Sequence, residues 1–181
     1  TTEIYTLSLH DALPIYRNEH SVELQVAFLQ RVLGPDPFVL VPLLLGSAAA
    51  LPAFSRAAFR DAAGGFLDEL AALLAEAGTL AVAGVDLCHI GPKFGHDRSA
   101  RELEAEALAH DAALLGAAAA GDPDAFWAEG ARVEDRYHVC GFLALAALLE
   151  VLPGARGRVL DHLLWHEEPT RSAVSCAGMV F

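Results

Sequence analysis

The hydrophobic positions of this chain follow a helical period in several separate segments. In the first segment, residues 18–33, the apolar residues recur at spacings of four, three and four: Val22, Val26, Leu29 and Leu33. This pattern predicts a helix that ends at Gly34-Pro35. Similar patterns predict helices over residues 54–77, 98–119 and 141–152, and a short helix begins at Asp122-Pro123. The segment 141–152 is almost wholly apolar, so we expect its helix to be buried.

Shorter apolar runs alternate with these helices and have the length of buried strands. They cover residues 38–45, 79–85, 159–165 and 173–181. Buried strands separated by helices favour a parallel sheet that is covered by helices. We therefore predict an α/β fold with a mostly parallel central sheet and helices on both faces.

Composition and charge restrict the class of protein. The chain has 181 residues, of which 54% are hydrophobic and 20% charged, which is typical of one folded domain. Its formal net charge of −12 makes phosphate backbones and anionic lipids poor ligands, so we expect neither nucleic acid nor a membrane as a partner. Three cysteines and no signal-peptide pattern indicate a cytoplasmic protein.

The first residues have a different character from the rest of the chain. Residues 5–15, YTLSLHDALPI, resemble the conceptual translation of a common sequencing adapter. Such segments are excluded from reasoning about the fold. We therefore expect residues 1–16 to be an artefact or disordered, and residues 17–181 to be the authentic part.

The strongest local signal for chemistry is the tetrapeptide 86–89, Asp86-Leu87-Cys88-His89, directly after the predicted strand 79–85. Ligands of α/β sheets bind beyond the carboxyl ends of the strands. A carboxylate and an imidazole at that place can bind a metal or form an acid/base pair. The structural alternative is that Asp86 caps a turn and His89 has only structural partners.

Two further segments contain candidate residues. Cys140 directly precedes the apolar helix 141–152, where the positive end of the helix dipole would favour its thiolate form. The structural alternative is a small buried residue at the entry of a core helix. His20 stands at the start of the first helix, where Ser21 or Asn18 could be the N-cap.

Taken in order, these segments resemble the Memo family, whose bacterial members are called AmmeMemoRadiSam system protein B. The resemblance covers about residues 17–181 and rests on several short motifs in the right order. They are residues 19–25 (EHSVELQ), 38–46 (FVLVPLLLG), 86–89 (DLCH), 122–126 (DPDAF), 140–141 (CG) and 172–181 (SAVSCAGMVF).

The resemblance implies a fold similar to the class III extradiol dioxygenases, which hold non-haem iron. The family's site is described as two histidines from the N-terminal half together with residues that match Asp86, His89 and Cys140 here. The two histidines belong to P-H-A-G-Y and G-x-x-H-type motifs, and neither occurs in this chain. We therefore expect the C-terminal part of a single Memo-like domain, incomplete at its N-terminus and with little or no activity by itself.

The leading hypothesis is a metal-dependent redox protein that holds iron or copper. Asp86 and His89 would be ligands, Cys140 an additional soft ligand or redox group, and His20 a residue that supports a ligand or faces the substrate. The resemblance implies a dioxygenase-like reaction on a small molecule that the sequence does not identify. It also implies a radical-SAM protein and an AMMECR-type domain protein as partners.

Two alternatives use the same residues differently. In a cysteine-dependent hydrolase or transferase, Cys140 would be the nucleophile, His89 the base and Asp86 the group that orients it. In a binding module without catalysis, the crevice would hold a peptide. The two enzyme hypotheses require that Asp86, His89 and Cys140 converge in space, although they lie in two distant segments.

Overall fold

The structure of the chain is a computed structural model that describes residues 20–34 and 38–181. Residues 1–16, interpreted above as adapter-derived, lie outside the described residues. The chain divides into two compact units, residues 1–44 and residues 45–181, and each is described by itself.

In the first unit, the described helix is α2 (His20–Leu33), which confirms the helix predicted from the apolar spacing. Gly34 ends it with a φ of 69° and donates its N–H to the Gln30 carbonyl at 3.1 Å. Residues 38–44 do not form the predicted strand. A strand needs a neighbouring strand for its backbone hydrogen bonds, and the sheet formed by the described residues consists of three strands from the second unit.

The second unit contains four α-helices, which lie where the sequence pattern predicts them. They are α3 (Arg56–Leu74), α4 (Ala100–Ala120), α5 (Pro123–Val133) and α6 (Phe142–Val151). Their starts carry local signals: the Ser55 and Asp122 side chains accept the Ala58 and Ala125 N–H groups at 3.2 and 2.9 Å. Short 3-10 turns complete the unit: η2 (Ala48–Ala50), η3 (Pro92–Phe94) and η4 (Glu168–Thr170).

The sheet of the second unit differs from the prediction. Its strands are β1 (His89–Ile90), β2 (Arg158–Glu167) and β3 (Ser172–Val180), in the order β1-β3-β2, and both pairs are antiparallel. Only the short turn 168–171 joins β2 to β3, whereas a parallel pair needs a crossover of a dozen or more residues. The predicted mostly parallel sheet is therefore wrong for the strands that the structure describes, although the unit does combine helices with a sheet.

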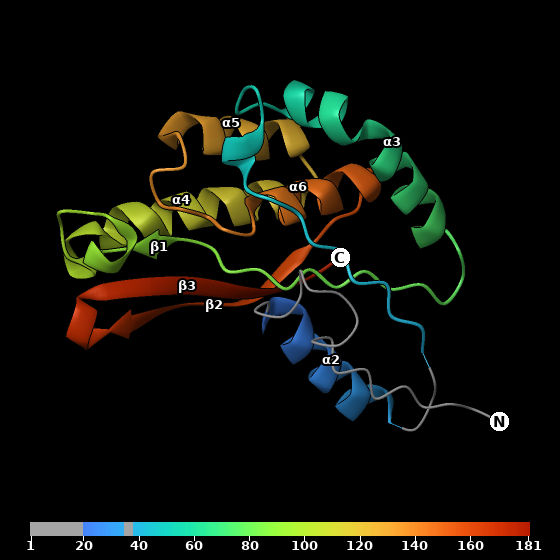
Figure 1. Cartoon of the computed structure of the whole chain (residues 1–181), viewed down its shortest axis with the longest axis horizontal. Helices are drawn as coiled ribbons and strands as arrows, with labels where there is room; N and C mark the ends of the chain where they lie inside the picture. The colour runs from blue at the N-terminus through green and yellow to red at the C-terminus, as the bar shows by residue number, and fades with distance from the viewer. Residues whose placement is uncertain (1–19, 35–37) are drawn as a thin grey trace. The chain divides into compact units, whose positions relative to one another are not determined.

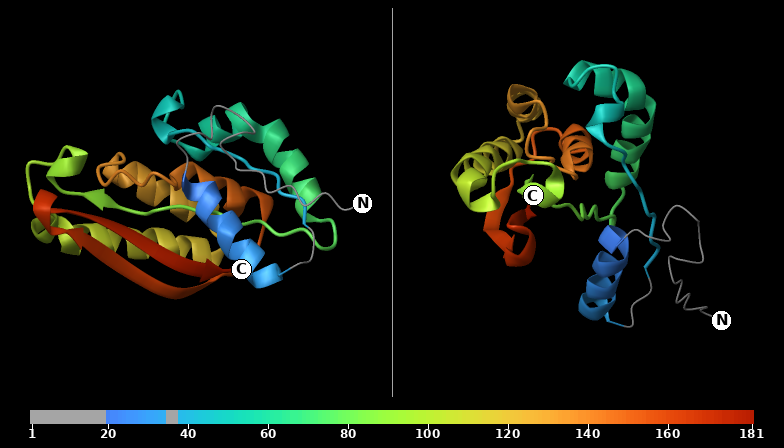
Figure 2. Two further views of the ribbon diagram at one scale, coloured as in Figure 1. Left: turned by 60° about the horizontal axis from the view of Figure 1, so that its bottom comes forward. Right: turned by 60° about the vertical axis from the view of Figure 1, so that its left-hand side comes forward.

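The predicted strand 79–85 also does not form, and His89 is the first of the described residues to pair in the sheet. Figures 1 and 2 show α4, α5 and α6 on the same side of the β2–β3 hairpin. The other face of the hairpin stays uncovered within this unit, and Trp165 is 59% exposed. The expected helices on both faces are thus not found in the second unit.

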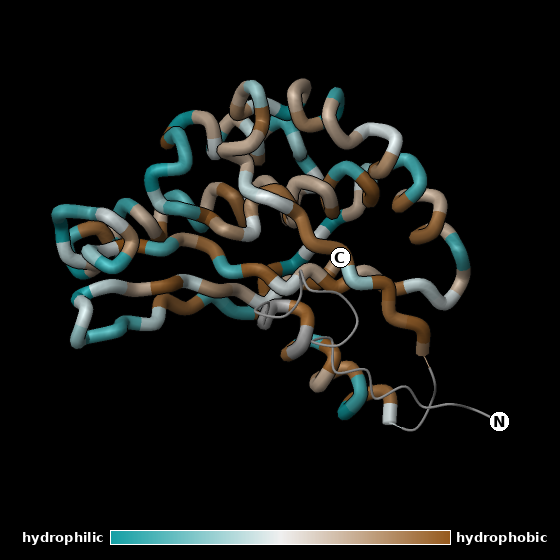
Figure 3. Tube along the Cα trace, viewed as in Figure 1, coloured by the Kyte–Doolittle hydropathy of each residue, from teal (hydrophilic) through white to brown (hydrophobic). Residues whose placement is uncertain are grey.

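The core of the second unit lies between the helices and the sheet. Aromatic rings from α3 and the residues just before it, from α5 and from α6 pack together with centroids 4.7–5.7 Å apart: Phe54, Phe59, Phe126, Trp127 and Phe142. Alanines and leucines of α4 continue this core toward β3, and Figure 3 shows α6 as a hydrophobic segment. Among the described residues, no helix combines the length and apolar character that a membrane span requires.

Candidate metal centre

The structure brings together the three residues that the sequence singled out in two distant segments. Asp86 and His89 lie just before and at the start of β1, and Cys140 lies two residues before α6. One potential ligand atom from each, a carboxylate oxygen, an imidazole nitrogen and the thiol sulfur, lies within 4.8 Å of the other two. Within the described ranges 20–34 and 38–181, Asp86, His89 and Cys140 are the one group of three potential ligands that lie close enough together to hold a metal ion.

The backbone beside Asp86 is held by three different parts of the fold. Three successive N–H groups donate to three acceptors: Leu87 to the Ser175 carbonyl at 2.9 Å, Cys88 to Asp111 Oδ1 at 3.3 Å, and His89 to the Tyr137 carbonyl at 2.7 Å. These acceptors belong to β3, α4 and the segment that leads to Cys140. The backbone that carries the site is therefore fixed by tertiary contacts.

His89 presents one defined nitrogen to the site. Its Nδ1 lies 3.0 Å from the Leu87 carbonyl oxygen, which can only accept, so Nδ1 carries the proton. Its Nε2 lies 3.9 Å from Asp86 Oδ2, and its ring meets the Phe94 ring edge-on at 4.9 Å. The His89 side chain is 16% exposed and that of Asp86 is 54% exposed, so the carboxylate borders solvent while the imidazole is held in place.

Cys140 reaches this place because a glycine follows it. A Cβ built on Gly141 would lie 2.2 Å from the Val85 Cβ, so a larger residue could not approach residue 85 so closely. The close approach places the Cys140 sulfur 3.8 Å from the Asp86 carbonyl oxygen, and Cys140 is exposed.

The other two cysteines have no such environment. Cys88 is completely buried with its thiol 3.7 Å from the Ala107 carbonyl, and burial raises the pKa of this thiol far above its ordinary value. Partial burial likewise raises the pKa of the Cys176 thiol. Both therefore favour the neutral thiol, which is the less reactive form.

The place of His20 is not described. His20 begins α2 in the first unit, and its side chain is outside what the structure describes. Its proposed support of a ligand or of the substrate stays a prediction.

Sequence reasoning missed the buried carboxylate behind the site. Asp111 on α4 is 0% exposed and bonds both the Cys88 N–H and His162 Nε2, the latter at 3.0 Å. The sequence does contain a signal for its burial. Asp111 stands beside His110, on the side of the predicted helix that carries the apolar residues Leu103, Ala107 and Leu114.

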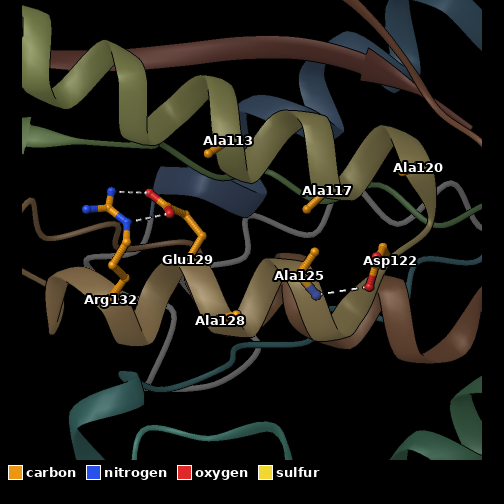
Figure 4. Close-up of a pocket in the computed structure, with 8 residues that line it drawn as sticks. All are labelled: Ala113, Ala117, Ala120, Asp122, Ala125, Ala128, Glu129 and Arg132. Atoms are coloured by element: carbon orange, nitrogen blue, oxygen red, sulfur yellow. Dashed lines mark hydrogen bonds and ion pairs between the residues drawn. The ribbon is translucent and has the colours of Figure 1, made fainter.

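A groove elsewhere in the second unit does not involve these residues. It has a volume of about 420 Å³ and runs between α4 and α5, where alanines line most of it (Figure 4). An ion pair between Glu129 and Arg132, at 2.7 Å, lies at one end and Asp122 at the other. The candidate metal centre is thus separate from this groove.

Comparisons with known proteins agree with the resemblance in the motifs. The model of the Memo-like protein family matches residues 5–180. The chain is 33% identical to a MEMO1 family protein of Thermus thermophilus over 91% of this chain and 45% of that protein. It is 30% identical to a MEMO1 family protein of Aquifex aeolicus over 98% of this chain and 43% of that protein.

The chain spans less than half the length of these curated relatives. No solved structure matches it. The resemblance predicted for about residues 17–181 is confirmed, and the chain belongs to the Memo-like protein family.

Proposed function

We propose that Asp86, His89 and Cys140 bind a redox metal, iron or copper, and that the whole protein is a metal-dependent redox enzyme related to the non-haem iron dioxygenases. The observation that carries this proposal is the convergence of the three ligand atoms within 4.8 Å. The dioxygenase-like fold of the whole domain, with its parallel sheet, is part of the same proposal.

The donor set fits such a metal. Bonds of about 2.0–2.3 Å leave two ligand atoms roughly 3–4 Å apart, so small rotations of the exposed Asp86 and Cys140 side chains close the site. Carboxylate and imidazole suit iron(II), whereas the thiolate favours copper(I). Bound iron or copper would supply one-electron and oxygen chemistry.

The residues of this chain would hold the metal in three distinct ways. The hydrogen bond from Nδ1 to the Leu87 carbonyl fixes the His89 ring and leaves Nε2 as the ligand. The half-exposed Asp86 carboxylate adds a negative charge that offsets the charge of the ion. The exposed Cys140 thiol lies where solvent and a small substrate can reach it.

The geometry supports a metal centre better than a cysteine–histidine–aspartate triad. In a triad, the carboxylate binds the imidazole nitrogen opposite to the one that faces the nucleophile. Here Asp86 Oδ2 lies nearest to Nε2, and Nδ1 is occupied by the Leu87 carbonyl. Asp86 is therefore poorly placed to orient His89 as a base for Cys140.

The activity of the whole protein requires more than these three residues. The two family histidines that would complete the site belong to motifs that this chain lacks, and the curated relatives are more than twice as long as the region they share with it. We propose that the chain binds metal but turns over little substrate by itself. The radical-SAM and AMMECR-type partners are likewise proposals for the whole protein.

The test is anaerobic titration of the purified chain with iron(II) and with copper(I), followed by measurement of bound metal. Cys140→Ser and His89→Gln each remove one donor, and we expect each to weaken binding at least tenfold. Cys176→Ser and His96→Gln are matched controls that change the same residue types elsewhere, and they should bind like the unmodified chain.

Equal binding by Cys140→Ser and by the unmodified chain would contradict the proposal, as would no binding at all. In the second case, rapid alkylation of Cys140 that slows in His89→Gln would favour the thiol nucleophile. Peptide affinity without metal binding or alkylation would favour the binding module.

A further inference from the structure

Asp111 is a completely buried carboxylate that is not one of the proposed metal ligands. It lies on α4 with 0% exposure, and both of its oxygens are engaged. Oδ1 accepts the Cys88 N–H at 3.3 Å, and Oδ2 lies 3.0 Å from Nε2 of His162 on β2. Burial of a carboxylate is unfavourable unless such partners compensate for its lost hydration, and an apolar residue would avoid this loss.

The contact with Cys88 reaches His89 through one peptide unit. The Cys88 N–H and the Leu87 carbonyl belong to the same planar peptide group, so fixing one fixes the other. The Leu87 carbonyl oxygen is the acceptor for His89 Nδ1 at 3.0 Å. A hydrogen-bonded series thus runs from His162 through Asp111 and this peptide to the His89 ring.

We propose that Asp111 is a positioning residue for His89. Its carboxylate fixes the orientation of the Leu87–Cys88 peptide, and that peptide holds the imidazole with Nε2 turned toward Asp86 and Cys140. His162 keeps the carboxylate in place from β2. Within such a series each hydrogen bond polarises the next, so the negative charge of Asp111 strengthens the acceptor of the Nδ1 proton. The functional consequence rests on the metal centre proposed above.

The test compares three variants of the full chain in two measurements. Asp111→Ala removes both contacts, whereas Asp111→Asn keeps an oxygen for the Cys88 N–H and an amide for His162. Glu129→Gln is the control, because Glu129 is also a mostly buried carboxylate, with its side chain 13% exposed, and also pairs with a histidine, His110 at 2.6 Å. Circular dichroism and thermal unfolding establish that each variant is folded.

The first measurement is a titration with cobalt(II). Binding is monitored through the thiolate-to-cobalt absorption band, which reports coordination by Cys140. Loss of a residue that orients a ligand typically weakens metal binding 10–100-fold. We expect that loss in Asp111→Ala, a loss of less than tenfold in Asp111→Asn, and unchanged affinity in Glu129→Gln.

The second measurement needs no metal. Nitrogen-15 spectra of the metal-free chain report which ring nitrogen of His89 carries the proton. We expect the Nδ1–H tautomer in the unmodified chain and in Glu129→Gln, a shift toward Nε2–H in Asp111→Ala, and a partial shift in Asp111→Asn.

The two measurements separate the two proposals. If the unmodified chain binds no cobalt but Asp111→Ala changes the tautomer, the metal centre is wrong and the positioning role holds. A folded Asp111→Ala with unchanged tautomer and unchanged affinity would overturn the positioning role alone. If Asp111→Ala does not fold, Asp111→Asn is compared with Glu129→Gln instead. The positioning role is then overturned if Asp111→Asn changes the His89 tautomer and the cobalt affinity no more than Glu129→Gln does.

Discussion

Two apolar segments of the second unit, α6 and residues 79–85, have opposite surroundings. In α6, six of the ten residues are buried, including Phe142 at 3% exposure. In residues 79–85, Leu80 is 72% and Val82 47% exposed. A helix satisfies its backbone hydrogen bonds within its own segment, whereas an extended segment needs a neighbouring strand. Apolar character alone therefore decides neither burial nor secondary structure.

The candidate metal centre lies where these two segments meet. Asp86 directly follows the extended segment, and Cys140 lies just before α6. The contact between Gly141 and Val85 joins them. Substitutions in α6, in residues 79–85 and at the contact itself test whether α6 is packed and residues 79–85 are exposed, as the structure shows.

The largest effect is expected on the packed side. Phe142→Ala removes a ring that lies 4.7–5.0 Å from those of Phe54, Phe126 and Trp127, and should lower the free energy of unfolding by about 3–5 kcal/mol. Phe66→Ala, the same change at a residue that is 43% exposed, should have an effect below about 1 kcal/mol. Urea unfolding measures both, and similar values for the two would show that α6 is not packed as described.

A smaller effect is expected at the contact itself. Gly141→Ala would place a Cβ 2.2 Å from that of Val85, so residues 85 and 141 must separate. Overpacking of this kind should lower the free energy of unfolding by about 1–3 kcal/mol. Because the separation also moves Cys140 away from Asp86, metal affinity should fall with it.

The matched control is Gly116→Ala in α4, where a Cβ would meet nothing within 4 Å. Replacing a glycine inside a helix with alanine should stabilise the chain by about 0.5–1 kcal/mol and leave metal binding unchanged. Metal affinity that is equal in Gly141→Ala and Gly116→Ala would contradict the role of the Gly141–Val85 contact.

The smallest effect is expected in the extended segment. The double change Leu80→Ser and Val82→Ser replaces two exposed apolar residues and should alter the free energy of unfolding by less than about 0.5 kcal/mol per residue. It should also reduce aggregation, because an uncovered apolar segment invites association between chains. A loss of 2 kcal/mol or more, on the order of a buried aliphatic side chain, would show that this segment is packed in solution.

The helices could be predicted from the sequence because their signals are local. Ser55 and Asp122 cap the helices that follow them, and Gly34 ends α2. The sheet could be predicted only in part, because the short connection between β2 and β3 is a local signal, whereas the lack of a described partner for residues 79–85 is not. Residues 79–85 have the composition of a strand but no described partner, and the turn 168–171 decides that β2 and β3 are antiparallel.

The candidate site was predictable in part. Asp86, His89 and Cys140 stand out as reactive residue types beside predicted elements, and their order along the chain resembles a family motif. Asp111 did not stand out, because its partners Cys88 and His162 lie 23 and 51 residues away along the chain. Long-range hydrogen bonds of this kind have no local sequence signature.

By itself, the sequence determined the membership of the family, the positions of the helices and the residue types of the site, since these depend on neighbouring residues and on motif order. Only the tertiary structure decided that residues 79–85 have no described strand partner, that a glycine brings a distant thiol beside a carboxylate, and that a buried aspartate accepts the N–H of the peptide next to the imidazole. The physical reason is that strand pairing, close packing and burial are properties of segments that meet in space, and no residue carries them alone.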